Sequence, residues 1–121
     1  MADWLMDYPS GKDGFFTPAE FETLREETLN QIEKDFRLQG IDLTFENKVI
    51  DYPQLVAIVG QKLEQEGLIN SLALRPLLYQ LDISEDYVQQ EITGKPKEST
   101  LLSDAIIKRC FAKVIYRKKF R

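Results

Sequence analysis

The fold is decided by the end of the chain, residues 101–121, whose sequence is LLSDAIIKRCFAKVIYRKKFR. Apolar residues recur there at steps of three and four, the spacing that aligns side chains along one side of an α-helix. The apolar arc is wide, so we predict a helix that is deeply buried against other elements. The arc consists of Leu102, Ile106, Ile107, Cys110, Phe111, Val114 and Ile115.

An earlier helix is predicted from residue 17 to about residue 38, ending at Gly40. Thr17 suits the N-cap, Pro18 suits the first helical position, and Glu20 lies where its side chain can complete a capping box. Its apolar stripe is expected to contain Phe21, Leu24, Thr28, Ile32 and Phe36.

Two more helices are indicated by their caps, one after Asp51 and a shorter one after Ser84. The first is expected to end at Gly67, and Gly60 within it is expected to let another helix approach closely. The shorter helix is expected to end at Gly94, before a polar linker over residues 94–100. The first of these helices should bury a stripe of Leu55, Ile58, Val59 and Leu63.

The most apolar part of the chain is SLALRPLLYQLD, residues 71–82. Pro76 interrupts it, so the segment forms either one helix that begins near Leu74 or two short pieces with a kink. Residues 41–52 are ambiguous, because their alternating apolar residues suit a short β-hairpin, a packed loop or a helical turn.

Taken together, these patterns predict an all-α fold: a compact single-domain bundle of four or five helices over residues 17–121. Residues 1–16 are expected to form an N-terminal arm. The bundle allows a short β-hairpin or packed loop near residues 41–52.

Composition excludes several classes of chemistry. The 121 residues contain no histidine, which rules out Ser-His and Cys-His nucleophile pairs, HExxH zinc sites and imidazole pH switches. The single cysteine, Cys110, cannot form an intrachain disulfide and suits a reducing compartment. The chain begins without the features of a secretory leader and lacks a long apolar run, so we expect a soluble, cytoplasmic protein that does not enter a membrane.

No catalytic, cofactor-binding or metal-binding residue is nominated. Asp82, Ser84 and Asp86 have the spacing of a calcium loop, but Tyr87 and Thr93 occupy the positions that require glycine and a bidentate glutamate. The glutamates of the helix over residues 17–38 are interpreted as a solvated face, and Cys110 as an inert core thiol.

Charge is divided unevenly along the chain. Residues 105–121 carry a net charge of +7, whereas residues 1–104 carry −11. We expect the basic end to contact an acidic protein surface, because the acidic body would repel the phosphates of a nucleic acid. The candidate contact residues at this end are Arg117, Lys118, Lys119 and Arg121.

Two apolar stretches suggest a further contact surface. Trp4 and Leu5 lie in the arm, and residues 74–81 contain several leucines that a core of this size is not expected to accommodate together with the arm. We therefore hypothesise a partner-binding or self-association surface; the alternative is that the arm folds over these leucines within one chain. The leucines concerned are Leu74, Leu77, Leu78 and Leu81.

The function expected from these features is a non-catalytic protein–protein interaction or regulatory module that binds another protein or a second copy of itself. The alternative is a small ligand-binding protein or enzyme that uses carboxylate and tyrosine groups in an interhelical pocket. A buried carboxylate beside a tyrosine in a concave site would favour the alternative, and a flat exposed apolar patch would favour the interaction module.

Overall fold

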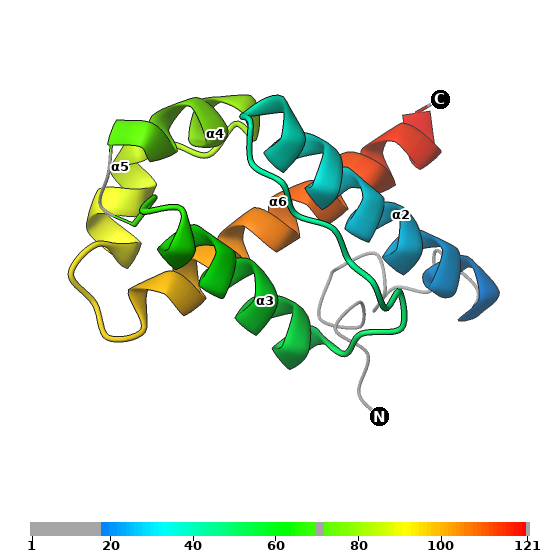
Figure 1. Ribbon diagram of the computed structural model, residues 1–121. Helices are drawn as coiled ribbons and strands as arrows, with labels where there is room; N and C mark the ends of the chain where they lie inside the picture. The colour runs from blue at the N-terminus through cyan, green and yellow to red at the C-terminus, as the bar shows by residue number, and fades with distance from the viewer. Residues whose placement is uncertain (1–17, 70–71, 121) are drawn as a thin grey trace.

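The computed structural model describes residues 18–69 and 72–120, and these contain helices and connecting segments without a strand (Figure 1). The predicted all-α fold is therefore confirmed. A 3₁₀ turn, η2, precedes α4, and a π-helical turn, η3, follows α5. In chain order the elements are α2 (Pro18–Leu38), α3 (Tyr52–Gln65), η2 (Leu72–Leu74), α4 (Arg75–Gln80), α5 (Glu85–Tyr87), η3 (Val88–Ile92) and α6 (Glu98–Phe120).

Helix α6 is the centre of the packing, because it contacts both of the other long helices, α2 and α3 (Figure 1). All seven residues of its predicted apolar arc are buried, which confirms that the end of the chain belongs to the core. The helix begins at Glu98 and not at Leu101, so the predicted linker is shorter than expected. Most of the core forms where α6 meets the apolar stripes of α2 and α3.

Gly60 lies where α3 and α6 approach each other. A β-carbon at this position would lie 3.4 Å from the backbone oxygen of Ser99 and 3.7 Å from the β-carbon of Ser103. Beside it, the Ser103 hydroxyl donates a hydrogen bond of 2.7 Å to the carbonyl of Val56. The expectation that Gly60 permits the close approach of another helix is confirmed.

The ends of α2, α3 and α5 follow the local chemistry of their sequences. Asp51 and Gln54 form a reciprocal capping box at the start of α3. The backbone amide of Tyr87 donates to the Ser84 hydroxyl, which caps α5. Gly40 has a φ of +78°, the left-handed conformation expected of a glycine that ends a helix. The predicted Thr17 cap lies outside the described residues.

The predicted buried stripe of α3 is wrong at one residue, Ile58. Leu55, Val59 and Leu63 are buried, but Ile58 retains 37% of its surface exposed. The first three recur at four-residue steps and face the core, whereas Ile58 lies at the edge of that face and lines a hollow beside Phe45.

Residues 41–51 form the packed loop that the sequence allowed as one alternative. Their alternation places the apolar side chains in the core without a partner strand among the described residues. Glu33 of α2 holds the loop, since its carboxylate accepts from the amide of Phe45 at 2.7 Å and pairs with Lys48 at 3.2 Å. The buried loop residues are Ile41, Leu43, Phe45 and Ile50.

Candidate functional site

The apolar segment around Pro76 forms the helix α4, which begins at Arg75 with Leu74 as its N-cap and follows the 3₁₀ turn η2. This is the predicted alternative of one helix that begins near Leu74. Its four leucines are core residues and are not exposed as a contact surface. The expectation that the core cannot hold both these leucines and the arm also concerns residues that lie outside the described ones. The four leucines recur with helical spacing and face inward together, so they do not belong to the exposed side of the segment, although Leu74 and Leu78 also line a pocket beside it. These buried residues are Leu74, Leu77, Leu78 and Leu81.

The opposite side of the same segment is exposed and largely apolar. Leu72 retains 73% of its surface and Tyr79 retains 90%, both high values for large side chains of this kind. We call this surface the α4 outer face. The segment is thus apolar on both sides, although only one side can contact the core. The α4 outer face consists of Leu72, Ala73, Arg75, Pro76 and Tyr79, all exposed.

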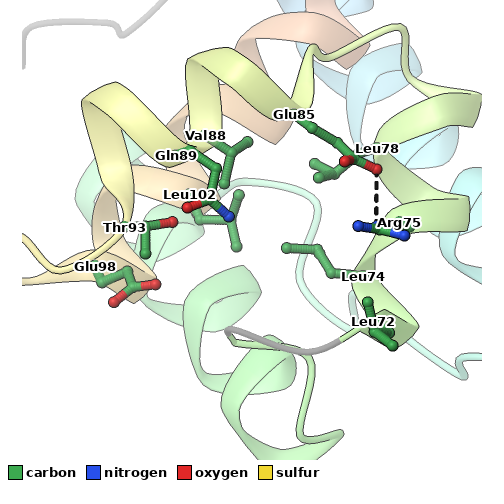
Figure 2. A pocket seen from close by; sticks show the side chains of 10 residues that line it. All are labelled: Leu72, Leu74, Arg75, Leu78, Glu85, Val88, Gln89, Thr93, Glu98 and Leu102. Carbon is green, nitrogen blue, oxygen red and sulfur yellow. Dashed lines mark ion pairs between the residues drawn. The ribbon is translucent and has the colours of Figure 1, made fainter.

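A small pocket of about 170 Å³ adjoins the α4 outer face (Figure 2). Leu74 projects into it from the η2–α4 side, and Leu102 of α6 lies across from it. At one edge, Arg75 Nε and Glu85 Oε1 form an ion pair of 3.0 Å that links α4 to α5. The pocket therefore combines apolar side chains with polar and charged ones. Its remaining lining residues are Leu72, Leu78, Val88, Gln89, Thr93 and Glu98.

A larger cavity of about 580 Å³ lies between α2 and α6, with Gln80 of α4 at its side. It adjoins a second hollow of about 290 Å³, and the two share Gln31, Lys34 and Arg117. We call the two together the α2–α6 trough. The larger part is lined by Gln31, Lys34, Asp35, Leu38, Gln80, Arg109, Ala112, Lys113, Tyr116 and Arg117.

Asp35 lies in the wall of the trough with only 1% of its surface exposed. Its carboxylate accepts from Lys113 Nζ at 3.1 and 3.2 Å and from Gln80 Nε2 at 2.8 Å. Gln31 Nε2 donates to it at 3.1 Å. This buried charge is therefore balanced by a cation and satisfied by two amides, and it connects α2, α4 and α6.

Cys110 is the buried neighbour of this carboxylate, with its sulfur 3.5 Å from Asp35 Oδ2. Burial raises the pKa of the Cys110 thiol well above its ordinary value of 9.0, and the charge of Asp35 raises it further. A thiol that stays protonated at neutral pH is a poor nucleophile. The burial and the raised pKa support the interpretation of Cys110 as an inert core residue.

The trough carries more cations than its carboxylates balance. Lys118 pairs with Glu27 at 3.1 Å, and Lys113 pairs with Asp35. Lys34 and Arg117 pair with no carboxylate within the described part of the chain. Arg109 is also engaged, since it contacts the carbonyl of Leu81 at 2.7 Å and the carboxylate of Asp82 at 3.1 Å.

The basic residues nominated from the sequence are only partly described. Arg117 lines the trough, and Lys118 is paired within the chain. The side chain of Lys119, the whole of Arg121, and the arm residues Trp4 and Leu5 lie outside what the structure describes.

Sequence reasoning did not nominate Asp35, although a signal was present. Asp35 follows Thr28 by seven residues and Gln31 by four, so it lies on the buried side of α2. A carboxylate on a buried helical face needs a partner from another element. That partner, Lys113, is far away in the sequence and could not be identified from periodicity.

The described residues contain no group of three or more Cys, Asp or Glu side chains placed to hold a metal ion. Among the described helices, none has the length and apolar character required to cross a membrane. Compared with known proteins, the chain has no matching family model and no significant match to a curated protein or a solved structure.

Proposed function

We propose that the protein is a non-catalytic interaction module that binds a protein partner through the α4 outer face. The observation that supports this proposal is that residues 72–81 have apolar side chains both on the side that faces the core and on the side that faces solvent. The inward leucines are buried, yet Leu72 and Tyr79 remain 73% and 90% exposed. Exposed apolar side chains of this size on one short segment are typical of surfaces that become buried in complexes.

The pocket beside Leu72 supports the same proposal. Its leucine and valine side chains can contact one apolar side chain of the partner, and the Arg75–Glu85 ion pair offers charged groups at the edge. Tyrosine and arginine are enriched among the residues that dominate binding energy at protein interfaces. Tyr79 and Arg75 are thus the expected anchors of the interface.

Affinity capture from the native host tests this proposal with matched variants. Leu72→Glu and Tyr79→Glu each place a charge on the α4 outer face, whereas Val49→Glu places one on another exposed apolar residue, in the loop over residues 41–51. We expect proteins captured by the wild type to be retained by Val49→Glu and lost with the other two. Capture of the same proteins by all three variants would refute the proposal, provided that their thermal melts agree.

Ligand binding between helices is a second candidate function, and one observation favours it. The buried carboxylate of Asp35 and the phenol of Tyr116 line the same cavity. Because Asp35 already accepts from Lys113, Gln31 and Gln80, it is held as a fixed charge. The cavity is therefore better suited to binding a ligand than to transferring a proton.

A further inference from the structure

We infer that the α2–α6 trough binds a small organic anion with an apolar body, whose charged head meets Lys34 and Arg117 and whose body packs on Leu38, Ala112 and Tyr116. This inference rests on the second candidate function, ligand binding between helices, and names the class of ligand. It does not depend on the α4 outer face.

The head of the ligand is indicated by the two cations. Lys34 belongs to α2 and Arg117 to α6, and both line the two hollows of the trough. No described carboxylate pairs with either, whereas the neighbouring Lys113 and Lys118 are each paired. Two like charges from opposite helices facing one cavity are complemented by an anion, and the arginine fork can hold it in a bidentate geometry.

The body of the ligand is indicated by the apolar residues beside these cations. Leu38 retains 64% of its surface and Tyr116 retains 66%, although both line a concave site. Ala112 of α6 contributes to the same lining. Burial of an aliphatic or aromatic group against these side chains would add hydrophobic binding energy to the charge contact.

The size of the cavity favours a small molecule over an acidic polypeptide. A volume of about 580 Å³ lies within the range of small-ligand sites. Gln80, at the side of the cavity, donates a hydrogen bond to the carboxylate of Asp35. Arg109 donates to the carbonyl of Leu81 and pairs with the carboxylate of Asp82. Among the described residues that line the trough, the cations that remain available are Lys34 and Arg117, which are enough for one charged head but not for a run of acidic side chains.

Titration of the ¹⁵N-labelled full chain by NMR tests this inference with defined probes. Octanoate carries both the charge and the apolar body, octan-1-ol carries only the body, and acetate carries only the charge. We expect octanoate to shift the amide signals around Leu38, Ala112 and Tyr116, and to bind about tenfold more tightly than either of the other two.

Substitutions then locate the charge contact. Lys34→Gln and Arg117→Gln are both at exposed positions, and each should weaken octanoate binding about tenfold. Lys95→Gln removes the same charge from an exposed turn that does not line the trough, and it should leave the affinity unchanged.

Three results would overturn all or part of this inference. Equal binding of octan-1-ol and octanoate would overturn the assignment of an anion while leaving ligand binding in the trough intact. Absence of octanoate binding would overturn the inference, and absence of binding by octan-1-ol and acetate as well would also count against the second candidate function. A hexaglutamate peptide that binds more tightly than octanoate at the same residues would assign the trough to an acidic polypeptide and overturn the small-molecule class.

Discussion

The ammonium group of Lys113 on α6 lies 3.1 Å from the buried carboxylate of Asp35 on α2. This ion pair connects the two helices beside the trough. Among the described residues, no other cation pairs with that carboxylate. The lysine side chain reaches solvent, whereas the carboxylate does not, because their side chains are 32% and 2% exposed. The cost of losing the pair therefore depends on which partner is removed.

Lys113→Met should lower the free energy of unfolding by about 3 kcal/mol, because it leaves the buried Asp35 charge without a counterion. Asp35→Asn should cost less, since the remaining Lys113 ammonium can reach water. Urea denaturation of both variants measures the difference. If Lys113→Met costs less than Asp35→Asn, the buried ion pair does not stabilise the domain in the way described.

Cys110 should be inaccessible to thiol reagents in the folded protein. Its pKa is raised well above 9.0 by burial and by Asp35, so it stays protonated under conditions where a free thiol ionises. The unfolded chain binds fewer protons above pH 9 than the folded one, so this group's contribution to stability falls as the pH rises. Labelling with a disulfide reagent at pH 8 should be slow without urea and complete in it. Fast labelling of the folded chain would show that the thiol is exposed.

Substitutions at Gly60 should depend on the size of the new side chain. Gly60→Ala places a β-carbon in ordinary contact with Ser99 and gains helix propensity, so stability should change by less than about 1 kcal/mol. Gly60→Leu must displace α6 and should destabilise by roughly 1–3 kcal/mol. Thermal melts of the two variants provide the comparison. A well-tolerated leucine would mean that α3 and α6 are not closely packed at this point.

The elements that could be predicted from the sequence are those determined by residues close together in the chain. The apolar arc of α6 and the caps at Asp51 and Ser84 depend on residues within one or two turns, so spacing and side-chain type identify them. The packed loop over residues 41–51 could not be distinguished from a hairpin, because the bonds that hold it come from Glu33 on another element.

The candidate sites were harder to predict for two physical reasons. The trough is assembled from α2, α4 and α6, and the partners of Asp35 are distant in sequence. The buried leucines of the α4 segment have the spacing of one helical face, but spacing alone does not show whether that face is covered by the core or by a partner. The structure assigns Leu74 and Leu78 to the interior and leaves Leu72 outside.

The most direct test of the proposed function is photo-crosslinking in the native host from position 79, with a benzophenone amino acid in place of Tyr79. The matched control carries the same amino acid in place of Val49, which is also exposed. The proposal predicts a discrete protein adduct from position 79 that is absent from position 49. No adduct from position 79, or the same adducts from both positions, would contradict a docking role for the α4 outer face.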